Sequence, residues 1–390
     1  MPAVQFSKVD IVFGRNLKPA LALVDQGATR DEILAKTGCV LGAAGIDLAI
    51  ERGEICVLMG LSGSGKSTIL RGINRLNKVS RGTVLVEHKG QTVDVVRCDE
   101  AMLREVRMHT VSTVFQQFAL LPWRTVRENV GFGLELQGMK GPERTRIVDE
   151  KLAMVGLSKW ADKHAHELSG GMQQRVGLAR AFATDAEILL MDEPFSALDP
   201  LIRNKLQDEL LELQDRLKKT IVFVSHDLDE AMKLGDRIVI LEGGRVVQSG
   251  TAEDIMLRPA DAYVAEFVQH MNPLNVLRGS AVMRPAAAVP RDSGALIFSG
   301  IRLELDGAGK PQRASCAGAE LRFAACTIDG EASLSGGEIL LAPVEMTLRD
   351  AMALKLRSAH PLLLVDDEGR LAGLCGEEEI YSSLLRRPNA

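Results

Sequence analysis

A single glycine-rich segment limits the fold of this chain more than any other feature. Residues 60–67 read GLSGSGKS and follow directly after the apolar run ICVLM at 55–59. The segment fits the pattern G-x-x-x-x-G-K-[ST] at every fixed position, and a strand in front of it is the context in which such a loop binds phosphate. A plain Gly–Ser loop is the alternative, and the preceding strand argues against it. The segment therefore predicts an α/β fold with a phosphate-binding loop at the carboxyl end of a buried strand.

The residue types in this loop divide the work of holding a nucleotide. Its glycines let backbone N–H groups curl around a phosphate, and the helix that follows presents its positive N-terminal end. Lys66 is expected to neutralise the β- and γ-phosphates, Ser67 to place its hydroxyl on Mg²⁺, and Thr68 to reach the α-phosphate. The predicted nucleotide-binding residues of the loop are Gly60, Leu61, Ser62, Gly63, Ser64, Gly65, Lys66, Ser67 and Thr68.

A second apolar strand ends in two acidic residues. The run ILLM at 188–191 is followed by Asp192 and Glu193. Asp192 is expected to hold the metal through water, and Glu193 to orient or deprotonate the attacking water. A strand ending in Asp-Glu is often only a solvated strand end, so this signal is weak alone and strong beside the phosphate-binding loop.

Composition and charge exclude several other functions. Lys and Arg number 47 against 52 Asp and Glu, and the net charge of −5 leaves no overall basic field for sequence-independent binding of nucleic acid. The 6 cysteines show no C-x-x-C pair and no metal-ligand spacing, which favours a reducing compartment over a disulfide scaffold. The N-terminus lacks a signal-peptide pattern, and no apolar run approaches the about 18 residues of a membrane span, so we expect neither secretion nor a membrane span.

The chain divides by pattern into three parts. Residues 1–38 are expected to form an N-terminal helical extension, with two short amphipathic helices or one interrupted helix over 17–36. From 39 to 272, short apolar runs alternate with helical segments, which predicts a largely parallel sheet with helices around it. Residues 273–390 begin with a shift to Ala, Gly and Pro and are expected to form a separate tail.

Residues 168–175, LSGGMQQR, carry a resemblance to one family. They look like the LSGGQ-type signature of ATP-binding cassette (ABC) ATPases, with Met172 in place of the commonest glutamine at that step. The rest of the family's set is also present: Gln116 in VFQQFALLP, Ser196-Ala197-Leu198-Asp199, and His226 in FVSHD. The resemblance implies an α/β fold class, with a P-loop ABC-type ATPase domain that carries a helical signature subdomain, followed by an α+β tail.

The resemblance also implies a role for each of these residues, with ATP and Mg²⁺ as cofactors. In this family the signature of one subunit closes over the phosphate-binding loop of another. Because the chain carries one copy of each motif, it is expected to work as a pair with a second copy of itself, enclosing two MgATP. The implied catalytic residues are Glu193, His226, Gln116 and Asp192, the implied metal ligands are Ser67, Gln116 and Asp192, and the implied residues of the opposing face are Ser169, Gly170, Gly171 and Asp199.

The base end of the nucleotide departs from the family's pattern. Many members stack adenine on an aromatic side chain at a set distance before the loop lysine, and Thr37 stands at that distance here. No Phe, Tyr or Trp occurs from 15 to 55. Apolar contact from Val40 or Leu41 is the expected substitute.

Absent features favour transport over other uses of an ABC cassette. The long coiled coil of chromosome-maintenance members and the second cassette of translation members are both missing, although a non-transport ABC ATPase in nucleic-acid maintenance or regulation stays the alternative. The blocks MGLSGSGKSTILRGINRL and FQQFALLPWRTVRENVGFGLE resemble the quaternary-amine subgroup of importers, which carry glycine betaine, proline or choline. The choline-transporting members are the most similar, which implies choline or a related quaternary amine as the substrate.

The resemblance to importers implies partners and a location. Two integral-membrane permease subunits are expected to dock their coupling helices after Gln116, where Phe118, Leu121, Pro122 and Trp123 are expected at the interface. An extracytoplasmic substrate-binding protein is an indirect partner, and no nucleic acid is expected. The implied location is the cytoplasmic face of the inner (plasma) membrane, as a peripheral subunit.

The tail carries a weaker resemblance. Residues 346–387, expected as a helix, a hairpin and a second helix, resemble a CBS module, a small β–α unit that senses nucleotides or ionic strength. Glu379 stands where such a module usually has a ribose-binding Asp. A second copy over 275–340 is degenerate, and 283–294 is expected to be a linker or a weakly ordered turn region. A regulatory tail and a merely structural or dimerising tail both stay open.

Overall fold

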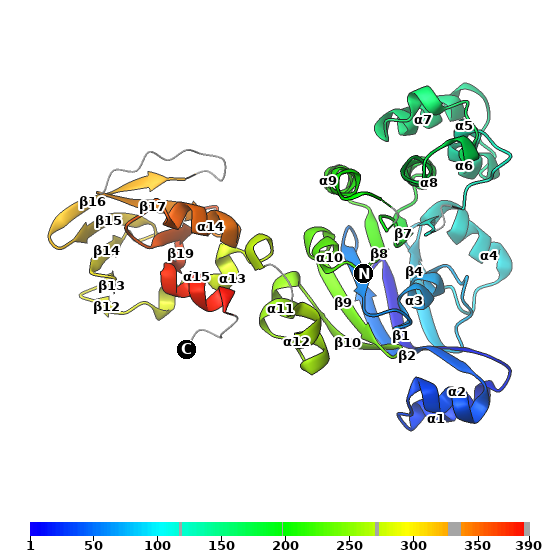
Figure 1. Ribbon diagram of the computed structural model, residues 1–390, viewed down its shortest axis with the longest axis horizontal. Helices are drawn as coiled ribbons and strands as arrows, with labels where there is room; N and C mark the ends of the chain where they lie inside the picture. The colour runs from blue at the N-terminus through cyan, green and yellow to red at the C-terminus, as the bar shows by residue number, and fades with distance from the viewer. Residues whose placement is uncertain (117–118, 197, 270–272, 327–336, 386–390) are drawn as a thin grey trace. The chain divides into compact units, whose positions relative to one another are not determined.

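The chain separates into two compact units, Met1–Thr251 (unit 1) and Ala252–Ala390 (unit 2). The computed structural model describes residues 1–390 except 117–118, 197, 270–272, 327–336 and 386–390 (Figure 1). Unit 1 contains residues 39–251 of the predicted ATPase domain, and unit 2 contains its last residues together with the predicted tail. The division falls earlier than the predicted 272/273 boundary, because helices α11 (Ala252–Leu257) and α12 (Ala262–Val268) belong to unit 2.

The central sheet of unit 1 places the predicted site strands side by side. Its order is β10-β9-β3-β8-β7-β6, with all neighbours parallel except the antiparallel pair β10 and β9. Every residue of β3, β7 and β8 is buried, which explains their unbroken apolar runs, since a strand covered on both faces needs no polar side. The strands are β3 (Ile55–Met59), β6 (Val111–Val114), β7 (Ile188–Asp192), β8 (Thr220–Val224), β9 (Arg237–Glu242) and β10 (Arg245–Gly250).

Helices cover both faces of this sheet. Figure 1 shows α9 and α10 on one side and α3 on the other. Pro at the start of α9 and the capping side chain of Asp199 before it fix where that helix begins. These helices are α3 (Lys66–Ile73), α9 (Pro200–Leu217) and α10 (Leu228–Leu234).

A second, antiparallel sheet packs beside α3 and begins at the N-terminus. Its order is β2-β1-β4-β5, with β1 (Val4–Phe13), β2 (Val40–Ile50), β4 (Arg81–His88) and β5 (Gln91–Asp94). The predicted helical extension over 1–38 is therefore wrong for its first part, because residues 4–13 form a strand whose Val4 and Phe6 enter the core. The predicted pair of short helices is present as α1 (Leu17–Asp25) and α2 (Arg30–Thr37), inserted between β1 and β2.

A group of helices forms a subdomain with a core of its own, as the sequence predicts. Figure 1 shows α5, α6 and α7 together at one end of unit 1, with α8 leading back to β7. Buried Val130, Leu152 and Val176 come from three of these helices and belong to one cluster. The helices are α5 (Val126–Val130), α6 (Phe132–Leu136), α7 (Gly141–Met154) and α8 (Gly170–Ala183), and α4 (Glu100–Glu105) and a π-helix (Val106–Thr110) precede them.

Unit 2 is built on one nine-stranded sheet of order β11-β19-β18-β17-β16-β15-β14-β13-β12. The predicted helix, hairpin and helix after 346 are present as α14 (Leu348–Lys355), the antiparallel pair β18 and β19, and α15 (Glu377–Leu384). The other elements are α13 (Gly279–Val282), β11 (Arg284–Pro285), β12 (Arg291–Asp292), β13 (Ala295–Phe298), β14 (Ile301–Leu305), β15 (Pro311–Cys316), β16 (Ala319–Ala325), β17 (Glu338–Pro343), β18 (Leu362–Val365) and β19 (Leu371–Cys375).

The first half of the tail does not repeat the second half. Over 275–340 the sequence predicts a degenerate copy of a β–α module, but β12 to β16 form an antiparallel meander, and in the described part of 291–326 no helix interrupts it. Alternating burial along β14 and turns with positive φ at Ser299, Gly309 and Ala317 favour hairpins over a helix. The predicted linker over 283–294 contains β11 and β12.

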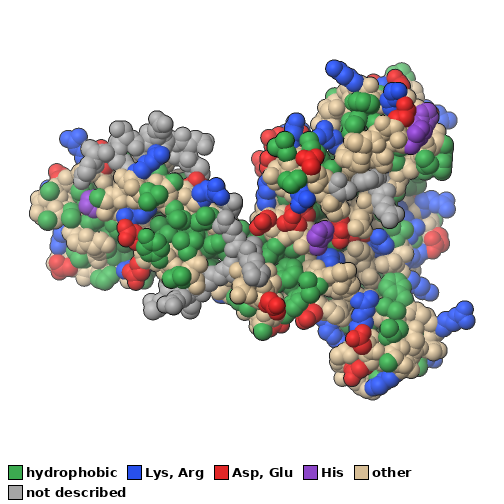
Figure 2. All heavy atoms as spheres, viewed as in Figure 1, with side chains coloured by type: hydrophobic (Ala, Val, Ile, Leu, Met, Phe, Trp, Pro, Cys, Tyr) green, Lys and Arg blue, Asp and Glu red, His purple; other side chains and the backbone are tan. Residues whose placement is uncertain are grey.

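Charges are mixed on the surface that can be seen. Figure 2 shows basic and acidic side chains interspersed over the visible face of unit 1, in keeping with the small net charge of −5. All 6 cysteines are free thiols. In the described ranges, every helix is too short or too polar to cross a lipid bilayer.

Candidate functional site

Five separated parts of unit 1 meet around one pocket of about 600 Å³. The pocket lies where β3, β7 and β8 end, because the residues after each strand contribute to its wall. It brings together most of the residues that the sequence assigns to nucleotide and catalysis. The lining residues are Arg30, Ser62, Gly63, Gly65, Lys66, Ser67, Thr68, Gln116, Glu193 and His226.

Two loop glycines have no room for a side chain. Gly60 has φ +140°, and a Cβ there would lie 2.1 Å from the carbonyl oxygen of Leu241. Gly65 has φ +103°, and a Cβ there would lie 2.3 Å from the carbonyl oxygen of Gly42. The loop is therefore pressed against neighbouring backbone, and α3 begins immediately after it at Lys66. This arrangement aims the amino end of α3 at the pocket.

Lys66 lies buried under the loop and holds it closed. Its Nζ donates to the carbonyl oxygens of Gly60 at 2.8 Å and Leu61 at 3.0 Å. Burial lowers the pKa of this amine, and the nearby carboxylates of Glu193 and Asp192 act against that shift. A buried cation whose hydrogen bonds go to neutral carbonyls gains much from an arriving phosphate, which supplies the missing negative charge.

Asp192 and Ser67 offer a pair of oxygens that suits Mg²⁺. Asp192 is 1% exposed, and the Ser67 hydroxyl donates to its Oδ1 at 2.7 Å. In the described residues no group of three His, Cys, Asp or Glu side chains could hold a metal, so an ion here would take its other ligands from phosphate and water. Mg²⁺ binds in that way, with one or two protein oxygens and the rest from substrate and solvent. These residues fit the ion.

Arg71 joins this pair and was missed by the sequence analysis. Its Nη2 donates to Asp192 Oδ2 at 2.9 Å, so the buried carboxylate has both a hydroxyl and a guanidinium partner. The signal was available, since Arg71 stands four positions after Ser67 on α3 and residues with that spacing share a helix face.

Glu193 is where the remaining catalytic candidates meet. Gln116 Nε2 donates to Glu193 Oε2 at 2.8 Å, and His226 Nδ1 lies 3.5 Å from the same oxygen. The backbone of Glu193 has φ +48°, an uncommon conformation for a residue with a side chain, and its N–H donates to Val224 at 3.1 Å. The turn after β7 thus points this carboxylate into the pocket between Gln116 and His226.

The signature residues and Asp199 lie elsewhere in unit 1. Ser169 caps α8 by accepting from the N–H of Met172 at 3.4 Å, and a Cβ added to Gly170 would meet no atom within 4 Å. Asp199 caps α9 by accepting from the N–H of Ile202 at 3.0 Å. None of Ser169, Gly170, Gly171 and Asp199 is among the lining residues of the pocket, and Ala197 of the predicted SALD segment is outside the described residues.

An aromatic side chain lies beside the start of α3, next to Thr68. Thr37 ends α2, and its hydroxyl donates to the carbonyl oxygen of Ile33 at 2.6 Å. A Cβ on Gly42, however, would lie 2.7 Å from Phe13 Cε2 and 2.8 Å from Thr68 Cγ2. Phe13, which is 40% exposed, therefore places its ring beside the side chain expected at the α-phosphate. Phe13 stands two residues before the range 15–55, which contains no Phe, Tyr or Trp.

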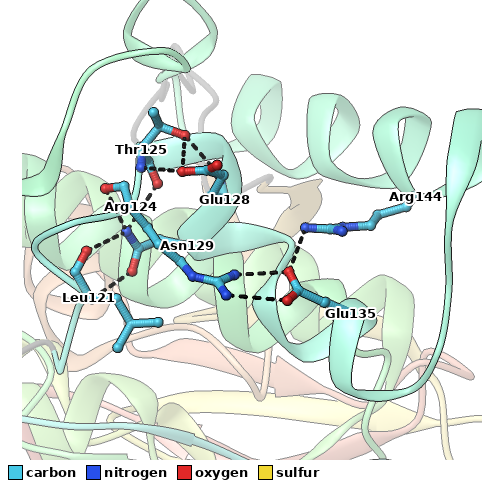
Figure 3. A network of polar contacts seen from close by, with 7 residues as sticks. All are labelled: Leu121, Arg124, Thr125, Glu128, Asn129, Glu135 and Arg144. Atoms are coloured by element: carbon cyan, nitrogen blue, oxygen red, sulfur yellow. Dashed lines mark hydrogen bonds and ion pairs between the residues drawn. The ribbon is translucent and has the colours of Figure 1, made fainter.

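The loop of residues 121–125 is held by a buried amide (Figure 3). The side chain of Asn129, at 0% exposed, accepts from the N–H of Leu121 at 2.8 Å. Its Nδ2 donates to the carbonyl oxygens of Leu121, Arg124 and Thr125 at 3.1, 3.2 and 3.0 Å. This loop is therefore a fixed shape rather than a free strand of chain.

A second set of contacts supports the same loop. Arg124 makes a two-pronged contact with Glu135 at 2.9 and 3.2 Å, and Arg144 adds a third bond to that carboxylate at 3.1 Å (Figure 3). Arg124 also lies over the ring of Phe132, 4.9 Å from its centre. Of the predicted interface residues, Pro122 and Trp123 are exposed and Leu121 is half-buried, while Phe118 is outside the described residues.

Comparisons with known proteins agree with this geometry. The model of the ABC transporter family matches residues 43–196. The chain is 47% identical over 291 residues to the glycine betaine transport ATP-binding protein OpuAA of Bacillus subtilis, covering 75% of this chain and 69% of that one. It is 50% identical over 273 residues to the glycine betaine/proline betaine transport system ATP-binding protein ProV of Escherichia coli, covering 70% and 67%. The dimeric structure of MJ0796, a bacterial ABC transporter cassette, is 31% identical with a TM-score of 0.55, covering 64% of this chain and 98% of that one.

Proposed function

The chain belongs to the ABC transporter family as an ATP-binding subunit, and we propose that it is the ATP-hydrolysing motor of a quaternary-amine importer. One observation carries the proposal: the phosphate-binding loop, Gln116, Glu193 and His226 surround a single pocket in a chain whose relatives are transport subunits. Glycine betaine is the amine named for both relatives. Choline, which the sequence favours, stays a prediction.

The geometry supports hydrolysis by an activated water. Lys66 and the amino end of α3 would bind the β- and γ-phosphates, and Ser67 and Asp192 would hold Mg²⁺, with Gln116 as the predicted third ligand. The ion would supply positive charge for the leaving phosphate. Glu193 would take a proton from the attacking water. Its carboxylate is held by Gln116 and faces His226.

A pair of chains would complete each site. Ser169 and Gly170 stand at the exposed amino end of α8, away from the pocket of their own chain. Helix amino ends bind anions well, so this one suits the γ-phosphate held by a second copy. The dimeric form of the related cassette supports such a pair.

We take residues 121–123 as the docking point for a membrane subunit. Trp123 is 71% exposed on a loop whose backbone is fixed by Asn129, and a rigid exposed Trp is a common anchor of protein interfaces. Two integral-membrane permease subunits would then hold the chain at the cytoplasmic face of the plasma membrane. The substrate-binding protein would act through those subunits.

Trp123→Ala should uncouple the motor from its membrane partners. Removing a central Trp from an interface commonly costs about 2 kcal/mol or more, which is roughly a thirty-fold loss of affinity. We expect weaker copurification with the permease subunits and slower uptake, while ATP hydrolysis by the isolated chain stays unchanged. Trp160→Ala is the matched control, since Trp160 is 40% exposed in the same subdomain. Normal uptake with Trp123→Ala would exclude this docking point.

Uptake of labelled substrates tests the proposed function. Cells with and without this gene should differ in uptake of glycine betaine, and the Glu193→Gln variant should fail to restore it. Labelled choline in the same cells tests the finer substrate prediction. If neither amine depends on the gene, the importer proposal fails.

The alternative of nucleic-acid maintenance has less support. Binding of nucleic acid without sequence preference needs a basic field, and both the net charge of −5 and the mixed charges of unit 1 argue against one. The relatives described above are named as transport proteins.

We interpret unit 2 as a structural or dimerising domain that does not bind ribose through Glu379. Glu379 is 6% exposed and accepts from Arg284 Nε at 2.9 Å and from the N–H of Gly376 at 2.9 Å. Both oxygens are therefore already engaged within the unit. Figure 2 shows hydrophobic side chains gathered over α14 and α15, where Leu356, Tyr381 and Leu385 are exposed, which supports a structural or dimerising role.

A further inference from the structure

Arg30 lines the nucleotide pocket although it comes from outside the motifs of the cassette. It is the first residue of α2, in the helical insert that joins β1 to β2. Its Nη1 donates to the carbonyl oxygen of Gly63, at the tip of the phosphate-binding loop. The other lining residues follow β3, β6, β7 or β8. The insert therefore adds a cation to the pocket that the cassette motifs of this chain form.

The insert is a firm support for this side chain. Buried Ala20, Val24 and Ile33 of its two helices pack with Cys39 and Leu41 in one cluster, so α1 and α2 cannot turn freely on the sheet. The strands that carry it pair directly, with Phe13 opposite Val40.

Polar contacts fix the end of α1 and the start of α2. Thr29 and Glu32 form a reciprocal cap at the start of α2, next to Arg30. Arg81 of β4 bonds Asp25 at the end of α1 at 2.6 Å and the buried Asp10 of β1 at 2.5 Å. Arg30 is thus presented from a rigid element, which lowers the entropy that a contact with a ligand costs.

The charge of Arg30 has no counter-ion in the described part of the chain. It makes no ion pair there, and its hydrogen bond to Gly63 goes to a neutral carbonyl. A guanidinium has five N–H donors in a planar fork, so donors remain after the bond to Gly63. A half-buried cation without a carboxylate, beside a loop built for phosphate, is an incomplete electrostatic pair.

We propose that Arg30 binds the phosphates of the nucleotide and thereby ties the helical insert to the occupied loop. The inference rests on the ATP-binding function proposed above and adds a residue to that site. Lys66 would hold the phosphates from beneath the loop and Arg30 from the side of its tip. Because α1 and α2 pack together in one cluster, a nucleotide held by Arg30 would also stabilise the whole insert.

The test compares three variants of the full chain for binding of ATP and of inorganic tripolyphosphate. Arg30→Gln removes the charge, Arg30→Lys keeps the charge without the fork, and Lys36→Gln removes an exposed cation from the last turn of the same helix. We expect Arg30→Gln to weaken both ligands about tenfold, Arg30→Lys to weaken them less, and Lys36→Gln to leave both within twofold of wild type.

Hydrogen exchange supplies a second readout that separates binding from folding. ATP should slow exchange of the amides of α1 and α2 in the wild type, and this protection should be lost in Arg30→Gln. The unfolding midpoint of the variant should match wild type, since Thr29 and Glu32 keep the cap of α2.

The outcomes separate the inference from the proposed function. Unchanged affinity in Arg30→Gln overturns the inference, and so does a loss for ATP that tripolyphosphate does not share, because that pattern indicates contact with the base or ribose. A wild-type chain that binds neither ligand would overturn the proposed function itself.

Discussion

Glu193→Gln is expected to reduce the rate of ATP hydrolysis by about 10²- to 10⁴-fold, which is the usual contribution of a general base. ATP binding is expected to be retained. The amide has the size of the carboxylate and can still accept the hydrogen bond that Gln116 donates at 2.8 Å. What it cannot do is take a proton from water. The measurement is phosphate release under saturating MgATP, together with the affinity for ATP.

The control for Glu193→Gln is a carboxylate away from the pocket. Glu143 lies exposed in the first turn of α7, and Glu143→Gln should hydrolyse ATP at the wild-type rate. A second expectation concerns assembly, since a chain that binds ATP without cleaving it should accumulate as the ATP-bound pair in size-exclusion chromatography. Wild-type turnover in Glu193→Gln would exclude Glu193 as the general base. His226, whose Nδ1 lies 3.5 Å from Glu193 Oε2, would then be the next candidate.

The position of the candidate catalytic residues was predictable because each stands at or shortly after the carboxyl end of a strand. Lys66, Glu193 and His226 stand just after β3, β7 and β8, and parallel neighbours bring their carboxyl ends together whatever the length of chain between them. Position along the sequence and position in space agree there, because the sheet fixes both.

The base end of the site was not predictable by counting. A fixed distance before Lys66 assumes a fixed length between β1 and the loop, and α1 and α2 are inserted within that length. The insert moves the end of β1 to Phe13 and leaves Thr37 at the counted position. The end of the first strand is the better marker, since Phe13 lies beside Thr68 through the pairing of β1 with β2.

Arg30 was out of reach of the sequence for a related reason. Nothing in the pattern of 17–36 distinguishes Arg30 from Lys36 as a surface cation of an amphipathic helix. Its contact with Gly63 depends on how the insert packs on β1 and β2, which is set by buried Ile33 and Leu41 together with Arg81. Such a tertiary placement leaves no local periodic signal.

The second half of the tail was predictable from local signals, and the first half was not. Residues after 346 carry helix and hairpin signals that the chain obeys locally, with Thr347 and Asp350 forming the cap of α14. The prediction for 275–340 assumed that this part repeats the module after 346. Its strands instead extend one sheet across the unit, and the parallel pair of β16 and β17 provides backbone hydrogen bonds for strand edges that would otherwise be unpaired.

Gly65→Ala is expected to have the largest effect on both stability and nucleotide binding. The added Cβ would lie 2.3 Å from the carbonyl oxygen of Gly42, and φ +103° is itself unfavourable for alanine. Strain and overlap together predict a loss of about 3 kcal/mol in the free energy of unfolding. The loop would have to move to remove this overlap, and the movement would displace the N–H groups expected to bind the phosphates. Two such bonds lost correspond to roughly a hundred-fold weaker ATP binding.

Gly138→Ala separates the two causes of that effect. Gly138 has φ +83° but no atom within 4 Å of an added Cβ, so its replacement carries the conformational cost alone. We expect about 1 kcal/mol of destabilisation and unchanged ATP affinity, measured by denaturant unfolding and equilibrium dialysis. If Gly65→Ala lost no more stability than Gly138→Ala and bound ATP as wild type does, the close approach of the loop to Gly42 could not be what shapes the phosphate site. A large loss in Gly65→Ala alone would assign that role to the contact between the two sheets of unit 1, because Gly42 lies on β2 and the loop follows β3.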